Sequence, residues 1–398
     1  MRQEKVVPFA IPQRQPAPER RGAAVTRLVL TDFRGYGRAR LTTEACPIVL
    51  AGPNGAGKTN LLEALSLLAP GRGLRRARLS EIDRRDPAAP TRPHPWAIAA
   101  TVTTPAGEFD IGTGRDAASE SGERRHLRFD GAPAKSQQEL VEHFSLVWLT
   151  PQMDRLFIDG ASGRRRFLDR LVYGIDPGHW ARLLAYERAL RDRARLLREG
   201  PADAAWLKAL EETMAENGVA VAAARIDAVA LLDAACREAA GPFPRASLAV
   251  EGTVETSLGA MPALAAEEEF RRSLLNARAL DRDSGTTQIG PHRADLVARH
   301  LGKDEAAPHC STGEQKALLI AIILAYARLI AARRGAAPVL LLDEVTAHLD
   351  AARRSALFGI LRDLGAQSWL AGTDAQLFAE FKGHAQFFSI DAAAIATG

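Results

Sequence analysis

A glycine-rich stretch near the start of the chain has the residue types needed to hold a phosphate chain. Residues 51–60 have the sequence AGPNGAGKTN and are followed by the apolar segment LLEALSLLA. The glycines let successive backbone N–H groups face an anion, and the N-terminus of the next helix adds its dipole. Lys58 would reach the β- and γ-phosphates of a nucleotide, and Thr59 would hold Mg²⁺ through its hydroxyl. The expected phosphate-binding residues are Gly52, Pro53, Asn54, Gly55, Ala56, Gly57, Lys58, Thr59 and Asn60.

A second segment supplies the acids that such a loop requires. Residues 339–344, VLLLDE, have the pattern of a buried strand that ends in two carboxylates. Asp343 would help to hold Mg²⁺, and Glu344 would orient and deprotonate an attacking water. Apolar strands that end in Asp-Glu are common, so this assignment depends on the phosphate loop elsewhere in the chain.

A third segment, CSTGEQKALLIA at residues 310–321, opens a long helix and offers a second helix N-terminus to an anion. Because the chain already has a phosphate loop, Ser311 and Gly313 are expected to contact the γ-phosphate of a nucleotide held by another subunit. Gln315 follows in the same segment. The alternative is an ordinary serine N-cap with Glu314 at the third helical position. The position of the segment before Asp343 favours the first interpretation.

Length and composition are those of an ordinary folded protein. A chain of 398 residues exceeds one modest core, which predicts two lobes or one domain with an insertion. The net charge of +4 decides nothing about partners by itself. The three cysteines, Cys46, Cys236 and Cys310, share no metal-ligand spacing, which favours reduced thiols and a cytoplasmic location. No stretch reaches the roughly 18 uninterrupted apolar residues that a membrane span needs, and no apolar region near the N-terminus is long enough for a secretory signal.

The pattern along the chain predicts an α/β head interrupted by helices. Alternating segments between residues 25 and 129 predict strands with a helix at 58–69, and the segments at 96–129 predict an antiparallel meander. Two long helical stretches follow, the second of them broken near Gly218, and a strand pair and a helix then lead back to the α/β pattern. The expected boundaries are a disordered tail at 1–23, a first lobe at 24–160, an inserted helical arm at 161–282 and a second lobe at 283–398.

These segments resemble the RecF family of ATP-binding-cassette (ABC) ATPases, which belongs to the SMC and Rad50 class. The resemblance covers residues 25–398 and includes LTDFRGYGRARL, RRRFLDRLV, YERALRDRARLL, IGPHRADL and LLLDEVTAHLD in the family's order. It implies an ABC-type ATPase head. A mixed sheet lobe and an α/β lobe with the signature and Walker B motifs would be separated by a helical arm.

The resemblance also implies roles for residues outside the three motifs. Arg34 would touch the nucleotide phosphates, and Asp350 would lie in the D-loop that couples two sites in a dimer. Gln315 would have a structural role in the signature segment. Gln152 would act as a Q-loop glutamine that senses the metal and the attacking water, although an exposed turn glutamine is the alternative.

The chain departs from the family pattern at the signature and at the D-loop. Glu314 stands where the family usually has glutamine, and a carboxylate near a γ-phosphate is unfavourable unless it points away. Ala347 and His348 replace the usual Ser-Glu pair. The segment AGTD at 371–374 lacks the switch histidine of transporters, which predicts slow hydrolysis. His292, in GPHR, has no assigned chemical role, and a structural turn is the alternative.

Clustered arginines are candidates for nucleic-acid contacts. The segment GRGLRRAR, just beyond the phosphate-loop helix, carries Arg72, Arg75, Arg76 and Arg78, and the arm carries further arginines. Such clusters bind phosphates without distinguishing sequence. The alternative is a solvated helix face stabilised by acid–base pairs.

The expected function is that of a slow, DNA-stimulated ATPase in recombinational repair. Two heads would close around two ATP molecules and hold duplex, gapped or junction DNA, and hydrolysis would release it. The resemblance implies RecO and RecR as partners in loading RecA, with no membrane partner. The alternatives are a transporter ATPase subunit, an SMC or Rad50 head, and a DNA clamp without turnover. The interval between 161 and 282 is too short for the long coiled coil of an SMC head.

Overall fold

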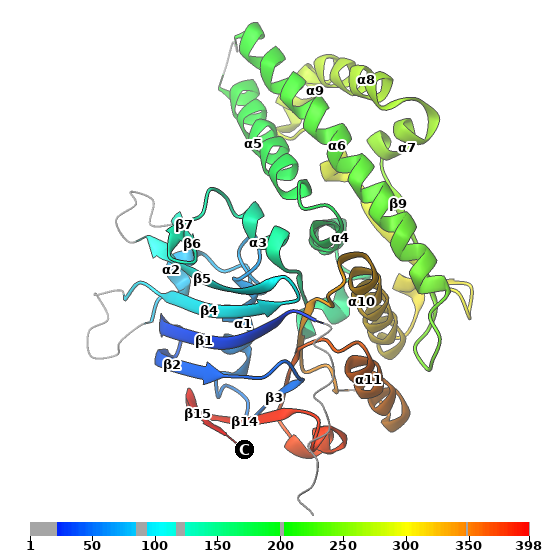
Figure 1. Ribbon diagram of the computed structural model, residues 1–398. Coiled ribbons are helices and arrows are strands. Elements are labelled where there is room, and N and C mark those ends of the chain that lie inside the picture. Colours follow the sequence, from blue (N-terminus) through cyan, green and yellow to red (C-terminus); the bar gives the residue numbers. More distant parts are fainter. Residues whose placement is uncertain (1–21, 85–93, 117–123, 200–202, 348, 398) are drawn as a thin grey trace, which may run out of the picture.

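The computed structural model shows an α/β head from which a helical arm projects (Figure 1). The structure describes residues 22–84, 94–116, 124–199, 203–347 and 349–397. The predicted tail lies almost wholly outside these residues. Ala23 is already ordered, because its N–H donates to the carbonyl of Ala337 at 3.2 Å.

The first sheet is antiparallel and has the strand order β2-β1-β4-β5-β6-β7. The expected meander at 96–129 is confirmed for its described residues, since β4 pairs with β5 and β5 with β6. The strands are β1 (Ala24–Phe33), β2 (Tyr36–Thr42), β4 (Ala97–Thr104), β5 (Gly107–Asp116), β6 (Arg124–Phe129) and β7 (Ala132–Pro133). Two short helices, α2 (Leu79–Ile82) and α3 (Gln138–His143), accompany this lobe.

The second sheet, with the order β15-β14-β3-β13-β12-β8, is parallel except for the pair β14–β15. Its central strands are continuous apolar runs, as expected for strands buried on both faces. The strands are β3 (Ile48–Ala51), β8 (Leu146–Leu149), β12 (Val339–Asp343), β13 (Ser368–Gly372), β14 (Gln386–Asp391) and β15 (Ala394–Thr397).

Alternate residues of β12 belong to two different cores. Leu341 packs with the first sheet and α1 (Lys58–Ser66), whereas Leu340 and Leu342 pack with the helices on the opposite face. Helix α1 therefore lies between the two sheets. It ends at Ser66 and not at Ala69 as expected, because residues 67–69 continue as turns. The opposite face is covered by η1 (Pro151–Arg155), α4 (Ala161–Ile175), α10 (Thr312–Arg334), α11 (Ala351–Asp363) and η4 (Ala375–Phe381).

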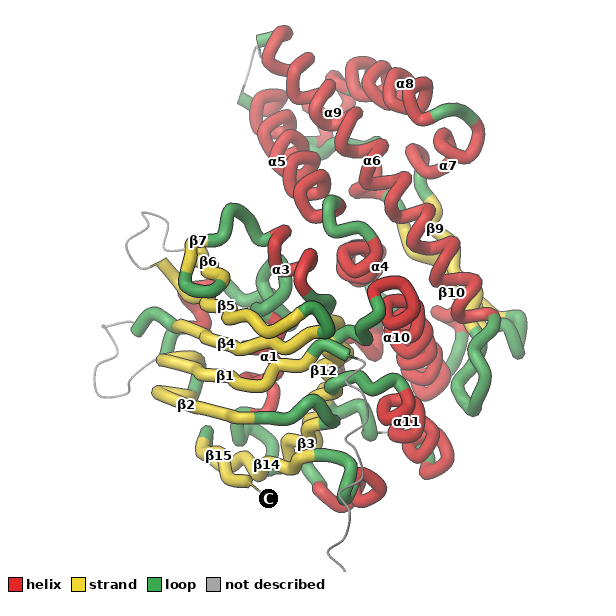
Figure 2. The backbone as a smooth tube through the Cα atoms, in the orientation of Figure 1, coloured by secondary structure: helices red, strands yellow, loops and turns green. Residues whose placement is uncertain are grey.

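The arm consists of long helices with a core of its own (Figure 2). Its elements are α5 (His179–Arg198), α6 (Ala204–Arg237), α7 (Thr253–Ala260), α8 (Ala263–Asn276) and α9 (Arg278–Ser284). A three-stranded sheet, β11-β10-β9, lies beside the head. It is formed by β9 (Ala246–Glu251), β10 (Asp295–His300) and β11 (Glu305–Ala306), with the short turns η2 (Pro291–Arg293) and η3 (Ala307–His309).

Two expectations about the arm were wrong. Helix α6 is continuous through Gly218, because the missing side chain makes room for a neighbouring helix: a Cβ at Gly218 would lie 2.8 Å from Phe270 and 3.1 Å from Tyr186. The expected strand pair is a single strand, β9, which pairs with β10 from beyond the arm.

Helix α6 connects the arm to the head. Its first half contributes Met214 and Val219 to the arm core, and its second half contributes Val229 and Leu232 to the head core. Helix α4 also packs in the head core, although it lies within the predicted arm interval. The arm core thus begins with α5, while the domain boundaries themselves stay predictions.

Helix α10 has the length and composition of a membrane span, but 78% of its most apolar window is buried inside the molecule. A core helix of a folded protein has the same properties.

Candidate functional site

The phosphate loop lies at the carboxyl edge of the parallel sheet. Strand β3 leads directly into it, and β13 lies between β3 and β12. The N–H of Gly52 donates to Gly372 at 3.3 Å, and that of Glu344 donates to Ala371 at 3.0 Å. The end of β13 thus connects the phosphate loop to the two acids, Asp343 and Glu344. Asp343 lies 284 residues after Thr59 in the sequence.

Glycine is required at Gly57, the last loop residue before α1. Its φ of 115° lies in the left-handed region, and a Cβ there would approach the Tyr36 hydroxyl to 2.6 Å. That hydroxyl donates to the carbonyl of Gly57 at 3.2 Å. Tyr36 therefore supports the loop from β2, a role that its sequence position did not reveal.

Lys58 is buried and closes the loop on itself. Its ammonium donates to the carbonyl oxygens of Gly52 at 2.6 Å and Pro53 at 2.8 Å. Burial lowers the pKa of Lys58, and the carboxylates of Glu344 and Asp343 oppose this effect. The charged form of the Lys58 ammonium is therefore destabilised by burial and stabilised by these two carboxylates.

Two of the three residues expected to bind the metal, Thr59 and Asp343, meet in the structure. The Thr59 hydroxyl donates to Asp343 Oδ2 at 3.0 Å, while Asp343 Oδ1 is buried without a hydrogen-bond partner among the described residues. Burial raises the pKa of Asp343 against the effect of the Thr59 hydrogen bond. A free carboxylate oxygen beside a hydroxyl fits a hard cation such as Mg²⁺, which keeps much of its shell for water and phosphate.

Glu344 and Gln152 lie at the same sheet edge but differ in their surroundings. Glu344 is half-buried, and its φ of 48° is unusual for a residue with a side chain. Gln152 is exposed and follows β8, the strand next to β12. No hydrogen bond joins Gln152 to Thr59, Asp343 or Glu344 among the described contacts, so its predicted roles in metal binding and catalysis stay predictions.

Arg34 is held by an acid that sequence analysis missed. Glu63, fully buried in α1, accepts from Arg34 at 2.7 and 3.0 Å and from Arg75 at 3.0 Å. Arg75 also donates to Asn60 Oδ1 at 2.8 Å. A buried acid paired with two arginines is strongly favoured over an unpaired one, so Glu63 fixes both guanidinium groups beside the loop.

The signature segment forms a capping box at the start of α10. Glu314 Oε2 accepts from the N–H of Ser311 at 3.0 Å and from its hydroxyl at 2.9 Å. Lys303 lies 2.5 Å from Glu314 Oε1. The Lys303 contact, followed by those of Ser311, lowers the pKa of Glu314 to about 2. The N-cap alternative thus describes the observed geometry, with Ser311 exposed and Gly313 half-exposed at the helix tip.

Two buried side chains connect this helix to the rest of the site. Gln315 donates to the carbonyl of Cys310 at 2.8 Å and so supports the loop before α10. Lys316 lies 3.3 Å from Asp154 and donates to the carbonyl of Glu344 at 3.4 Å. Lys316, which sequence analysis did not select, therefore links the signature helix to the acid of the phosphate site.

Asp350 and His292 have local structural partners. Asp350 caps α11 by accepting from the N–H of Arg353 at 2.8 Å. His292 contacts the Tyr186 hydroxyl at 2.6 Å and the carbonyl of Thr287 at 2.9 Å. The alternative of a structural turn describes His292.

The four arginines selected for DNA contact are placed differently. Arg75 binds Glu63 and Asn60 as described above, whereas Arg72 and Arg76 are exposed and line cavities between head and arm. Arg78 is exposed at the start of α2.

The chain is similar to known proteins over most of its length. The model of the RecF/RecN/SMC N terminal domain matches residues 24–389. The DNA replication and repair protein RecF of Mesorhizobium japonicum is 48% identical over 369 residues, which cover 92% of this chain and 96% of that protein. The RecF protein of Brucella suis is 48% identical over 371 residues, with coverages of 93% and 95%.

Solved structures share the fold. The recombination mediator protein RecF with ATP, in the RecFOR pathway, has a TM-score of 0.81 at 22% identity and covers 96% of this chain and 100% of its own. An Smc head from Pyrococcus furiosus, bound to a domain of ScpA, has a TM-score of 0.53 at 15% identity, with coverages of 94% and 96%. The fold is that of an ABC-type ATPase head with an inserted arm, as expected, and the chain belongs to the RecF family.

Proposed function

We propose that this chain is an ATP-dependent DNA-binding protein of replication and repair whose heads dimerise on ATP. Two heads close around two nucleotides. Ser311 and Gly313 of each head complete the nucleotide-binding site of the other head. The closed dimer holds duplex or gapped DNA. Slow hydrolysis then releases it.

The observation that carries this proposal is the meeting of Lys58, Thr59 and Asp343 at one sheet edge, with Thr59 and Asp343 3.0 Å apart. The two N-termini of α1 and α10 offer separate anion sites within one chain. A composite site between two chains uses both. The names of the relatives, which are replication and repair proteins, supply the biological setting.

Thr59 and Asp343 would hold Mg²⁺, which screens the phosphate charge. Lys58 releases its loop carbonyls to bind the β- and γ-phosphates. Glu344 orients a water against the γ-phosphate and accepts its proton. The absence of a histidine in residues 371–374 is the reason to expect slow turnover.

The test compares two variants by light scattering and DNA filter binding, with and without ATP. Glu344→Gln keeps the shape of the site but removes the proton acceptor, so it should bind ATP, remain dimeric and stay on DNA. Lys58→Ala removes the phosphate contact and should remain monomeric with ATP. If Glu344→Gln protein neither dimerises nor gains affinity for DNA, the composite-site mechanism is wrong.

The same experiment separates the alternative functions. A clamp without turnover would release DNA at the same rate in the wild type and in Glu344→Gln protein. In the proposed pathway, the chain acts in the cytoplasm with RecO and RecR to load RecA at gaps. Adding these proteins to the ATP-bound dimer on gapped DNA should accelerate RecA filament formation, and no acceleration would contradict this assignment.

A further inference from the structure

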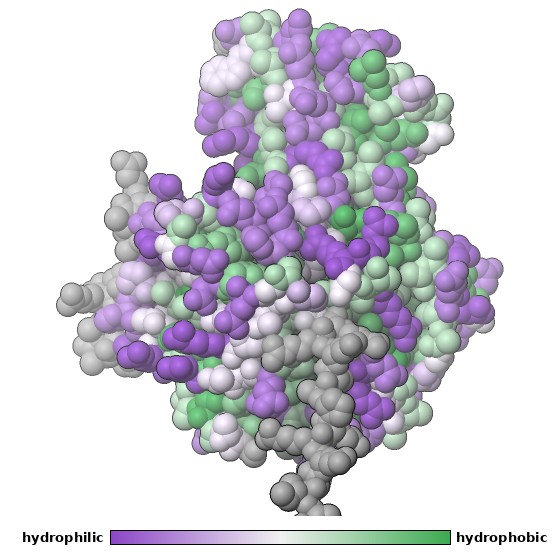
Figure 3. All heavy atoms as spheres, in the orientation of Figure 1, coloured by the Kyte–Doolittle hydropathy of each residue, from purple (hydrophilic) through white to green (hydrophobic). Residues whose placement is uncertain are grey.

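A groove lies where the arm meets the head. It comprises three adjoining cavities of about 250, 190 and 200 Å³ between the loop at residues 71–76 and helices α4 and α5. Arg76 and Arg166 line all three cavities, which we call the arm–head groove. Hydrophilic side chains gather at this junction on the face shown in Figure 3.

Positive charge in the groove lacks matching acids. Arg72, Arg76, Arg166 and Arg170 have no ion pair within the part of the chain that the structure describes, and Arg170 Nε is buried without a hydrogen-bond partner. Burial, followed by the neighbouring charges of Arg76 and Arg165, lowers the pKa of Arg166. The groove therefore suits an anion.

The three acids that line the groove have other ionic partners. Asp159 lies 3.2 Å from Arg155. Asp169 binds Arg225 at 2.8 and 2.9 Å and His179 at 2.8 Å. Glu187 is half-exposed and lies 3.8 Å from Arg191. Arg76 also has a φ of 57°, a strained conformation that is common at binding sites.

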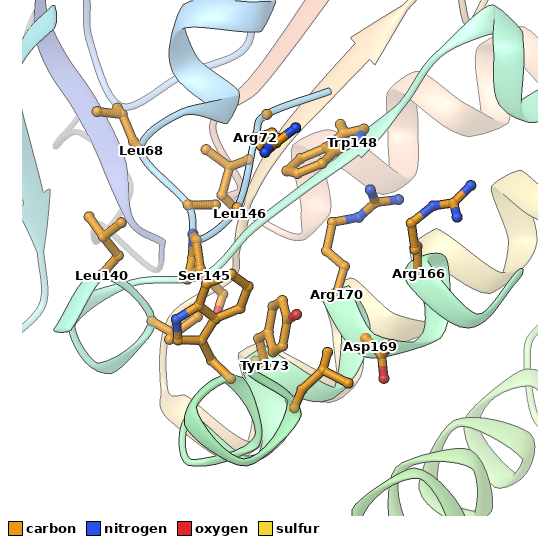
Figure 4. A pocket seen from close by; sticks show the side chains of 18 of the residues that line it. Leu68, Arg72, Leu140, Ser145, Leu146, Trp148, Arg166, Asp169, Arg170 and Tyr173 are labelled. Carbon is orange, nitrogen blue, oxygen red and sulfur yellow. The ribbon is translucent and has the colours of Figure 1, made fainter. Parts of the chain in front are cut away.

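The largest cavity adds aromatic and apolar walls to this charge (Figure 4). Arg166 and Arg170 both extend from α4, and the Arg170 guanidinium lies 4.0 Å from the centre of the Trp148 ring. Tyr173 and Trp180 meet edge to face, with ring centres 5.6 Å apart. Aromatic rings and guanidinium planes are the groups on which unstacked bases pack.

We propose that the arm–head groove binds an unpaired nucleotide of gapped DNA. The phosphates contact Arg76 and Arg166, and the base enters the cavity lined by Trp148, Tyr173 and Trp180. A paired base would first have to leave its stack, so an unpaired base at a gap enters at a lower cost. The groove thereby gives the protein a preference for gaps over intact duplex. This inference rests on the proposed DNA-binding function.

The test uses the full chain with ATP at one fixed salt concentration. One DNA carries 2-aminopurine as an unpaired base at a gap, and the other is the same sequence as an intact duplex. Wild-type protein should quench the unpaired probe and bind the gapped DNA on the order of tenfold more tightly than the duplex, which is the range of one base stacked on an aromatic ring.

Two variants change the cavity and one serves as a control. Trp180→Ala removes a stacking face, and Leu184→Glu places an acid at an exposed position of the cavity wall. Both should abolish the preference for gapped DNA and the quenching while leaving duplex affinity within about twofold. Arg272→Gln, on the exposed face of α8 away from the groove, should behave as the wild type.

The outcomes separate the two proposals. No ATP-dependent binding to either DNA would contradict the proposed function. Normal duplex binding with no gap preference and no quenching would overturn the groove proposal alone. A preference for gapped DNA that both variants retain would also overturn the groove proposal, and a protein would then be the ligand to test.

Discussion

The signature glutamate at position 314 points back into its own helix and occupies the groups of Ser311. Glu314 accepts hydrogen bonds from Ser311 and contacts Lys303, so its negative charge is balanced by groups of the same chain. The same contacts occupy the hydroxyl and N–H of Ser311, which are the groups proposed to bind the γ-phosphate of the second subunit. Glu314 therefore competes with that phosphate.

Glu314→Gln should strengthen ATP-dependent dimerisation. Glutamine keeps the capping box, so α10 should retain its stability, but the negative charge next to the γ-phosphate is removed. We expect the dimer to form at an ATP concentration lower by roughly fivefold, which corresponds to about 1 kcal/mol. Sedimentation or light scattering across an ATP titration measures this midpoint.

Lys303→Met is the matched variant for this prediction. It removes the cation that neutralises Glu314 while it leaves the capping box, so the midpoint should move to higher ATP. If both variants shift the midpoint in the same direction, charge at position 314 does not control dimerisation.

The residues of the site that could be predicted from sequence are those whose chemistry lies within one short segment. Lys58 and Thr59 follow the glycines directly, and Ser311 opens its own helix. Glu63 and Lys316 could not be predicted, because their partners Arg34 and Asp154 are distant in sequence and a buried acid or lysine has no local pattern. Only the packing of the elements shows them.

At the scale of elements, most of the strands and helices followed from periodicity, and the expected break in α6 was wrong because of a glycine. The segment GPHR packs closely against the arm helix α5. Gly290 has a φ of 138°, and a Cβ at this position would lie 2.4 Å from the Tyr186 hydroxyl. Gly218 makes room for the same tyrosine on α6. These glycines serve close packing between helices, which a single sequence does not distinguish from a break.

The hydrogen bonds of His292 predict a pH dependence of stability. Its Nε2–H donates to Thr287 and its Nδ1 accepts from Tyr186, so the neutral ring is bound, and burial lowers its pKa to about 4. The unfolded chain takes up a proton near pH 6.5 and the folded protein does not. The free energy of unfolding should therefore fall as pH drops from 6.5 to 4, by about 3 kcal/mol at most.

Charged neighbours act on His292 in both directions. Arg293 and Arg165 lower its pKa further, and Asp281 raises it. His292→Gln provides the check, since glutamine can donate and accept in a similar place without titrating. Urea unfolding at pH 7 and pH 5 should show a smaller loss of stability for the variant, and parallel losses in both proteins would contradict the assignment.

At the scale of the whole molecule, arm and head are joined by a buried ionic cluster around Arg225 and Asp169 as well as by α6. Arg225 of α6 holds Asp169 of α4 through two hydrogen bonds and also donates to the carbonyl of Pro291 at 2.6 Å. Burial alone would raise the pKa of Asp169, but Arg225 and His179 more than offset this and lower it to about 2. Asp169 is thus charged in the interior and depends on its partners.

Arg225→Met should loosen the arm from the head. The substitution leaves a buried carboxylate with one partner fewer, and breaking such a pair costs about 3–5 kcal/mol of unfolding free energy. Chemical denaturation monitored by circular dichroism measures the loss. The control is Arg237→Gln on the same helix, where the Asp233 pair is half-exposed and should contribute less than about 1 kcal/mol. Replacing Asp169 by asparagine in the Arg225→Met background removes the stranded charge, keeps an acceptor for His179 and should restore part of the stability. A loss that persists in this double variant would mean that Arg225 supports the junction by packing and by its bond to Pro291 rather than by charge.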